Sequence, residues 1–193
     1  MSFGPVLEAA LEAQQTCTRS GFQFCVIGGV ALQRWGEPRF TVDADLAVLV
    51  EPGEESRAIR SLLAGLSARI AEATAFAERT RVVLARSALD VDIDIVLAGL
   101  PYEARVIERA SDWHLDDATA LRTCSAEDLL VMKAFAARDK DWADVTSILE
   151  RQADKLDLEL VRTELAPLVA AKEAPEIAEQ LERRIHRHWK SEP

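Results

Sequence analysis

The stretch that decides the fold is VIGGVALQRWGEPRFTVDADLAVLV, residues 26–50. Its last part has the alternation of a β-strand, which places Asp43 and Asp45 on one face together with Ala47 and Leu49. A buried carboxylate is costly without a counter-charge and two side by side repel each other, so a hard metal ion explains the pair better than packing does. Taken alone, an Asp-x-Asp at a strand end is more often structural than metal-binding.

Two glycines, Gly28 and Gly29, stand before these aspartates, between an apolar run at 22–27 and a helical segment at 30–35. Glycine lets the backbone come close to a ligand, and the start of a helix points N–H groups at an anion such as a triphosphate. A Gly-Gly pair by itself is usually only a turn. The order strand, Gly-Gly, helix, Asp-x-Asp strand makes the functional interpretation stronger.

A second acidic strand is LDVDIDIVLAG, residues 89–99, in which Asp90, Asp92 and Asp94 share one face. If this strand neighbours 42–50, three carboxylates converge at one end of the sheet. Such a set suits one or two Mg²⁺ ions that hold substrate phosphates for in-line displacement. The sequence therefore predicts a phosphoryl-type transfer centre.

The remaining patterns predict an α+β chain. The first half alternates strands and helices, and the segments after Ser125, which with Asp128 resembles a capping box, have helical periodicity. We predict an α+β core at 1–110, followed by a C-terminal helical region at 111–193 that packs on the core. The predicted helices are 5–20, 30–35, 54–72, 102–110 and 125–137, with three more beyond, and the predicted strands are 22–27, 42–50, 80–86 and 90–97.

The overall composition limits the partners. A formal net charge of −10 and a pI near 4.9 disfavour a surface built entirely for nucleic acid, although LERRIHRHWK at 181–190 is locally basic. Cys17, Cys25 and Cys124 lie far apart, which is typical of a reduced cytoplasmic protein without structural zinc. Because no apolar run is long enough to cross a bilayer and no export signal precedes the first helix, we expect no membrane association.

Together these residues resemble the nucleotidyltransferases of the polymerase-β-like superfamily. The resemblance rests on Ile27-Gly28-Gly29, then Asp43-Ala44-Asp45, then Asp92 or Asp94 on a later strand. Within the superfamily the chain is most similar to the AbiEii-like branch, which includes toxins of type IV toxin–antitoxin systems. Three longer stretches between about 24 and 149 carry that similarity: GEPRFTVDAD, DIVLAGLPYE and SAEDLLVMKAFAARDKDWADV.

This resemblance implies the nucleotidyltransferase fold, with a mixed sheet and flanking helices in the core and a helical bundle in the rest of the chain. It also implies the transfer of a nucleoside monophosphate from an NTP to a hydroxyl, with Mg²⁺ or Mn²⁺ as cofactor. Asp43, Asp45 and the third carboxylate would be the catalytic, metal-binding set, the third as general base or second-metal ligand. Asp94 fits that third position best by its distance to Pro101-Tyr102-Glu103, and Asp92 is the alternative. The implied nucleotide contacts are Gly28, Gly29, Arg39, Thr41, Lys133, Arg138, Lys140 and Asp141.

Two questions stay open at the level of sequence. Taken by itself, the segment with Lys133 and Asp141 is better explained as a solvated charged helix face, whereas beside the aspartates a role in neutralising phosphate charge is favoured. The acceptor implied by the toxin branch is RNA, such as a tRNA end, with a protein hydroxyl or a small molecule as alternatives, and a cognate antitoxin as partner. A catalytically silent binding or antitoxin-like protein on the same scaffold is the alternative function.

Overall fold

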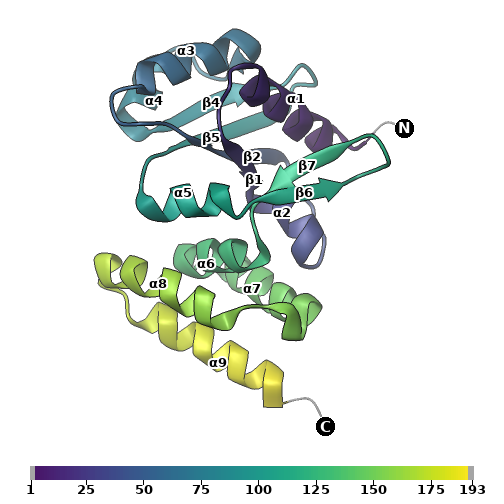
Figure 1. Cartoon of the computed structure of the whole chain (residues 1–193), viewed down its shortest axis with the longest axis vertical. Helices are drawn as coiled ribbons and strands as arrows, with labels where there is room; N and C mark the ends of the chain where they lie inside the picture. The colour runs from purple at the N-terminus through teal and green to yellow at the C-terminus, as the bar shows by residue number, and fades with distance from the viewer. Residues whose placement is uncertain (1–2, 191–193) are drawn as a thin grey trace. The chain divides into compact units, whose positions relative to one another are not determined.

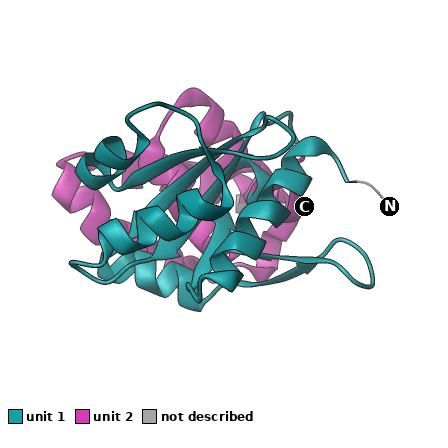
Figure 2. Ribbon diagram, turned by 90° about the horizontal axis from the view of Figure 1, so that it is seen from above, with its two compact units in different colours: residues 1–31, 39–124 teal, residues 32–38, 125–193 magenta. Residues whose placement is uncertain are grey.

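The computed structural model describes residues 3–190 and divides into two compact units, which are considered separately. Unit 1 comprises Met1–Ala31 and Arg39–Cys124, and unit 2 comprises Leu32–Pro38 and Ser125–Pro193 (Figure 2). The division after the N-terminal part thus falls between Cys124 and Ser125, whereas the sequence-based boundary was 110/111. The boundary lies later than expected because residues 111–123 form a β-hairpin that extends the sheet of unit 1.

Unit 1 is built on a mixed seven-stranded sheet with the order β3-β4-β5-β2-β1-β7-β6. The central strands β5, β2 and β1 are joined by a parallel β2–β5 pairing and an antiparallel β1–β2 pairing. The predicted α+β class with a mixed sheet is therefore confirmed. The strands are β1 (Phe24–Ile27), β2 (Asp43–Leu49), β3 (Ser67–Ala68), β4 (Val82–Arg86), β5 (Asp92–Ala98), β6 (Ser111–His114) and β7 (Ala120–Thr123).

Helices cover both faces of this sheet: α1, α3 and α4 lie on one side and α5 on the other (Figure 1). The α1 side holds the main core, in which Leu46 and Val48 of β2 align with Ile95 and Leu97 of β5. Each such fully buried side chain contributes about 1.5–3 kcal/mol. The alternate residues of the same strands, including the aspartates, belong to the α5 side. The helices of unit 1 are α1 (Pro5–Arg19), α3 (Glu55–Gly65), α4 (Ala73–Thr80) and α5 (Pro101–Glu108), and α2 (Gly28–Trp35) begins there.

The helix predicted at 54–72 is wrong in its second half. Helix α3 ends at Gly65, where the chain passes so close to α1 that a Cβ would lie 2.6 Å from the side chain of Thr16. Ser67 and Ala68 then pair with β4 as the edge strand β3, before α4 begins at Ala73. A helical pattern in sequence cannot report this cross-strand pairing, since β4 lies further along the chain.

Unit 2 is helical, as predicted for the C-terminal part. Ser125 caps α6 as expected, because its Oγ accepts a hydrogen bond from the Asp128 N–H at 3.0 Å. The last turn of α2 is tied to α7 within this unit, since Arg151 and Gln152 donate to the carbonyls of Gly36 and Trp35 at 2.6 Å each. The helices are α6 (Ala126–Ala136), α7 (Asp139–Gln152), the short 3₁₀ turn η1 (Ala153–Lys155), α8 (Leu158–Lys172) and α9 (Glu176–Lys190).

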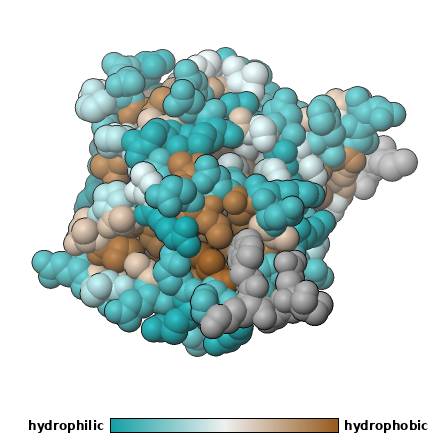
Figure 3. Space-filling model, turned by 60° about the horizontal axis from the view of Figure 1, so that its bottom comes forward, coloured by the Kyte–Doolittle hydropathy of each residue, from teal (hydrophilic) through white to brown (hydrophobic). Residues whose placement is uncertain are grey.

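The surface is mainly polar. Figure 3 shows one face of the molecule, on which hydrophilic side chains surround an apolar area. Among the described residues, none of the helices is both long and apolar enough to cross a membrane. Large apolar side chains that stand exposed are Phe40, Val42, Ile70, Leu89 and Leu100.

Candidate active site

Four aspartates lie in two adjacent rows where β2 and β5 begin. In the parallel pairing of these strands Asp43 is aligned with Asp92, and Asp45 with Asp94. The pairing of β2 with β1 places Ile27 on the other side of Asp45. Aligned residues of neighbouring strands project from the same face of a sheet. The two acidic strands are therefore neighbours, which was the condition for a shared acidic site, and their four aspartates lie on the α5 side of the sheet.

The Gly-Gly pair packs directly on the Asp-x-Asp segment. Gly28 has φ +63°, and a Cβ at this position would lie 1.9 Å from Oδ2 of Asp45. A Cβ at Gly29 would lie 2.5 Å from Oγ1 of Thr41, whose hydroxyl donates to Oδ1 of Asp43 at 3.0 Å. Only glycine satisfies both the backbone angle and the space at position 28. The start of α2 is thus held against the first acidic pair.

Two arginines neutralise the second acidic pair. Nη1 of Arg69 lies 3.2 Å from Oδ2 of Asp92 and 2.8 Å from Oδ1 of Asp94. Arg86, at the end of β4, lies 3.0 Å from Asp92 and 3.2 Å from Asp90. Asp92 is therefore shared by two guanidinium groups, whereas Asp94 faces Arg69.

Asp94 differs from Asp92 in its electrostatics. Burial raises the pKa of Asp94 above its ordinary value and the charges of Asp43 and Asp92 raise it further, although the Arg69 guanidinium acts in the opposite direction. The Arg69 guanidinium pairs with Asp94, with Nη1 2.8 Å from Oδ1. Within residues 3–190, Oδ1 of Asp94 is a buried oxygen that no donor satisfies. Asp94 and Asp92 thus differ in burial and in their partners, and the choice of Asp94 as the third carboxylate stays a prediction.

The donor chemistry of this cluster fits a hard divalent cation. All the candidate ligands are carboxylate oxygens, and one of them, Oδ1 of Asp94, is buried without a hydrogen bond in the described part of the chain. Over the same residues, no three His, Cys, Asp or Glu side chains converge closely enough to hold a metal ion by themselves. Mg²⁺ usually takes only one or two protein carboxylates and completes its shell with substrate phosphates and water. One or two of these carboxylates could therefore hold a divalent cation whose remaining ligands come from outside the protein.

The Pro-aromatic-Glu stretch after β5 has a structural explanation. Pro101 occupies the first turn of α5, where its missing N–H costs nothing. The Glu103 carboxylate accepts hydrogen bonds from the N–H groups of Gly99 and Leu100 at 2.8 and 2.9 Å. This motif fixes the turn from β5 into α5.

A second charged cluster lies inside unit 2. Nζ of Lys133, on α6, lies 2.8 Å from Oδ2 of Asp144 and 3.4 Å from Oδ1 of Asp141, both on α7. The side chains of Asp141 and Asp144 are 0% and 3% exposed, so this is a buried ion cluster. Arg138 adds a second cation, with Nε on Oδ2 of Asp141 and Nη2 3.2 Å from Oδ1. The alternative of a solvated charged face is wrong for Lys133 and Asp141.

The charges around Asp141 outweigh its burial. Burial alone would raise the pKa of the Asp141 carboxyl, but the hydrogen bond from Arg138 and the positive charges of Lys133 and Arg138 hold that pKa below its ordinary value. Asp141 is therefore ionised at neutral pH. It holds both cations at the junction of α6 and α7.

The other predicted contacts are less constrained. Arg39 donates to the carbonyl of Phe40 at 3.3 Å, and Lys140 is exposed in the first turn of α7. The structure thus groups Gly28, Gly29, Thr41 and the aspartates within unit 1, and it groups Lys133, Arg138 and Asp141 within unit 2. Arg69 was missed from the sequence because residues 67–70 fell inside the predicted helix 54–72.

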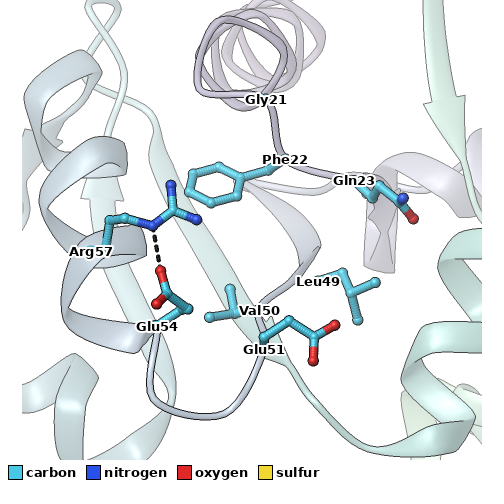
Figure 4. Close-up of a pocket in the computed structure, with 8 residues that line it drawn as sticks. All are labelled: Gly21, Phe22, Gln23, Leu49, Val50, Glu51, Glu54 and Arg57. Atoms are coloured by element: carbon cyan, nitrogen blue, oxygen red, sulfur yellow. Dashed lines mark hydrogen bonds and ion pairs between the residues drawn. The ribbon is translucent and has the colours of Figure 1, made fainter.

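A hollow of about 180 Å³ in unit 1 lies at the opposite ends of β1 and β2 from the aspartates. Figure 4 shows the Phe22 ring beside the Arg57 guanidinium, which is paired with Glu54. Val50 and Glu51 also line it. Because Arg57 is already neutralised, the hollow offers no convergent set of reactive groups.

Solved structures with a similar fold are nucleotidyltransferases. The solution structure of the antibiotic-resistance factor ANT(2'')-Ia superposes with a TM-score of 0.58 at 16% identity, covering 90% of this chain and 96% of that chain. A crystal structure of ANT(2'')-Ia in complex with adenylyl-2''-tobramycin gives a TM-score of 0.51 at 19% identity, covering 86% and 99%. The fold of this chain is therefore that of the nucleotidyltransferases.

A further similar structure is an antigenic nucleotidyltransferase-like protein from Paracoccidioides brasiliensis, with a TM-score of 0.46, 16% identity and 91% coverage of both chains. A comparison with curated protein sequences found no match. The family model described as "Nucleotidyl transferase AbiEii toxin, Type IV TA system" matches residues 17–192. The chain belongs to this AbiEii family, and it is an enzyme of the nucleotidyltransferase class.

Proposed function

We propose that this enzyme transfers a nucleoside monophosphate from an NTP to a hydroxyl group with the help of Mg²⁺ or Mn²⁺, and that it is the toxin of a type IV toxin–antitoxin pair. The observation that carries the proposal is the row formed by Asp45 and Asp94 on paired strands, with Gly28 packed against Asp45. The family description supports the toxin role and a cognate antitoxin as partner.

The proposed metal ligands are Asp43, Asp45 and Asp94. A bound Mg²⁺ or Mn²⁺ would neutralise charge on the phosphates and orient them for in-line displacement. Thr41 supports this role because its hydrogen bond to Asp43 fixes one carboxylate in place. Gly28 supports it because its closeness to Asp45 leaves that carboxylate little freedom to turn.

In the proposed reaction the acceptor oxygen forms a bond to the α-phosphorus of the NTP. The bond from that phosphorus to the oxygen bridging the β-phosphate breaks, and pyrophosphate leaves. The acceptor proton would pass to the third carboxylate, Asp94 or Asp92, if this group acts as the general base rather than as a ligand of the second metal ion. The N–H groups at the start of α2, from Gly28 and Gly29, would face the triphosphate.

The proposed phosphate contacts from unit 2 are Lys133, Arg138 and Lys140, with Asp141 as the anchor of the first two. Two buried carboxylates hold the Lys133 ammonium in one position, which is the preorganisation that charge stabilisation requires. Arg39 is a further proposed contact beside Thr41. These assignments come from the motif alone.

The proposed acceptor is an RNA hydroxyl, such as the end of a tRNA, with a protein hydroxyl and a small molecule as alternatives. RNA is the acceptor that the resemblance to the toxin branch implies. The structure of ANT(2'')-Ia with adenylyl-2''-tobramycin provides the small-molecule precedent, in a protein of similar fold. The acidic total charge of −10 requires that any RNA contact be local.

The chemistry can be tested by release of pyrophosphate from each NTP with Mg²⁺ or Mn²⁺ and candidate acceptors. Asp43→Asn and Asp45→Asn keep the side-chain shape and remove the charge, so each should reduce turnover by at least about 100-fold. Turnover that survives in both variants would overturn the proposed metal set. Thermal unfolding of each variant serves as the control for folding.

The toxin role needs a separate measurement in cells. Induced expression of the wild-type chain should stop growth, whereas Asp45→Asn should not, and co-expression of the cognate antitoxin should restore growth. Equal growth arrest by both chains would contradict the link between toxicity and nucleotidyl transfer.

A further inference from the structure

Arg69 sits at the outer end of the row that contains the central aspartates. Its N–H donates to the carbonyl of Leu84 at 3.0 Å, Leu84 is aligned with Asp94, and Asp94 is aligned with Asp45. The side chain of Arg69 crosses β4 on this face and reaches both Asp92 and Asp94. Although it lies beside the short edge strand β3, it is only 19% exposed.

The Arg69 guanidinium occupies the place at Asp92 and Asp94 where a divalent cation would bind. Its Nη1 lies 2.8 Å from Oδ1 of Asp94, the buried oxygen that lacks a hydrogen bond in the described residues. Two neighbouring carboxylates repel each other, and one shared guanidinium relieves that repulsion as a metal ion would. As long as Arg69 stays there, a divalent cation meets an Asp92–Asp94 pair whose negative charge is already partly neutralised.

The same guanidinium is suited to a phosphate. It is planar, always charged and presents paired donors that match phosphate oxygens as well as carboxylate oxygens. A metal–nucleotide complex brings both a cation for the aspartates and phosphate anions for the arginine. When the complex binds, the metal ion can therefore replace Arg69 as the partner of Asp94, and the phosphates can replace Asp94 as the partner of Arg69.

We propose that Arg69 is a positioning residue that couples metal binding to nucleotide binding. Without nucleotide it neutralises Asp92 and Asp94 and weakens the affinity for a free divalent cation. When a metal–NTP complex enters, Arg69 leaves the carboxylates and pairs with the phosphates, which exposes Asp94 to the reacting groups. This inference rests on the proposed nucleotidyl transfer and adds the prediction that metal and nucleotide bind cooperatively.

Arg86 provides a matched control. It is also an arginine paired with Asp92, but its other partner is the exposed Asp90, and its contacts do not include Asp94. Its removal takes away the same charge from the same part of the sheet. A general electrostatic effect would move both variants equally, whereas the proposed coupling is specific to Arg69.

The test is a titration of the purified chain with Mn²⁺, following free Mn²⁺ by electron paramagnetic resonance, alone and with the α,β-methylene analogue of each common NTP. The wild type should bind Mn²⁺ weakly alone and much more tightly with the analogue. Arg69→Gln should bind Mn²⁺ alone at least about tenfold more tightly than wild type, and gain about tenfold less from the analogue. Arg86→Gln should stay within about threefold of wild type in both titrations.

The outcomes separate the two proposals. If the wild type binds no Mn²⁺ with any analogue, the proposed metal-dependent transfer fails. If the wild type shows the gain but Arg69→Gln binds Mn²⁺ alone no more tightly, or changes as Arg86→Gln does, the role of Arg69 is overturned. If Arg69→Gln does not fold, Arg69→Lys replaces it. Lysine keeps the positive charge but lacks the planar set of paired donors. Arg69→Lys should therefore still bind Mn²⁺ weakly in the absence of the analogue, but the analogue should raise its Mn²⁺ affinity less than it does for the wild type. An equal increase in affinity would contradict the proposal.

Discussion

Position 28 accepts only glycine, because its φ is +63° and the Asp45 carboxylate fills the space that a Cβ would need. Gly28→Ala would place a Cβ 1.9 Å from Oδ2 of Asp45, so Asp45 or the start of α2 must move. A misplacement of this order in a catalytic group can cost about 100-fold in rate. We therefore expect NTP turnover to fall by about that factor, measured as pyrophosphate release.

Gly21 is the matched control for this substitution. It has a similar angle, φ +73°, but no atom lies within 4 Å of the position of its Cβ. Gly21→Ala should cost only the backbone strain, about 1–2 kcal/mol of stability, and leave turnover unchanged. If Gly28→Ala behaves like Gly21→Ala in both respects, the close packing on Asp45 has no catalytic importance.

Loss of Lys133 should destabilise unit 2. Lys133→Met leaves the buried Asp144 without its 2.8 Å partner, and breaking a buried ion pair from one side costs about 3–5 kcal/mol. Adding Asp144→Asn removes the stranded charge, so the double variant should recover part of that loss. Chemical denaturation of the two single variants and the double variant measures this coupling, and strictly additive losses would contradict the buried cluster.

At the scale of elements, the contact between α6 and α7 depends on the ionised Asp141. Its pKa is lower in the folded chain than in the unfolded chain, so its contribution to stability is complete above the ordinary pKa, near about 4, and is lost as the pH falls through the folded pKa. Denaturation midpoints followed from about pH 6 to pH 2 should fall in the acid range. Asp141→Asn should show a shallower fall, and equal slopes would be the contrary result.

The elements also explain what sequence patterns can and cannot predict. Strands β2 and β5 were predictable because their alternation is regular and their aspartates mark one face. The strands β3, β6 and β7 have only two to four residues and depend on partners elsewhere in the chain. Arg69 escaped prediction for that reason, since only the pairing of β3 with β4 brings its side chain to Asp94.

At the scale of the whole molecule, the division into a sheet-based unit and a helical unit was visible in the sequence, but its place was not. The hairpin of β6 and β7 has the exposed, polar residues Ser111, Asp112 and His114, which do not suggest a strand of the main sheet. Residues 32–38 belong to unit 2, where Arg151 and Gln152 donate hydrogen bonds to this segment. Sequence patterns do not predict these contacts, because the two residues lie far along the chain.

The three cysteines report on the integrity of the whole chain. Cys17, Cys25 and Cys124 are buried and form no disulfide bond, and burial raises the pKa of Cys17 to about 12. A thiol reagent at pH 8 should therefore react with few or no thiols in the folded protein and with all three after denaturation. Rapid reaction of Cys17 in the native protein would show that the α1 core opens easily.

We propose above that the aspartates of β2 and β5 support the transfer of nucleoside monophosphates. The most direct measurement is incubation of the chain with each α-³²P-labelled NTP and Mg²⁺ or Mn²⁺, with and without total tRNA, beside Asp43→Ala. We predict that label moves onto an acceptor with the wild type and not with the variant, and the labelled species names donor and acceptor. Label that moves equally well with Asp43→Ala, or a wild type that neither transfers label nor binds any NTP, would contradict the account.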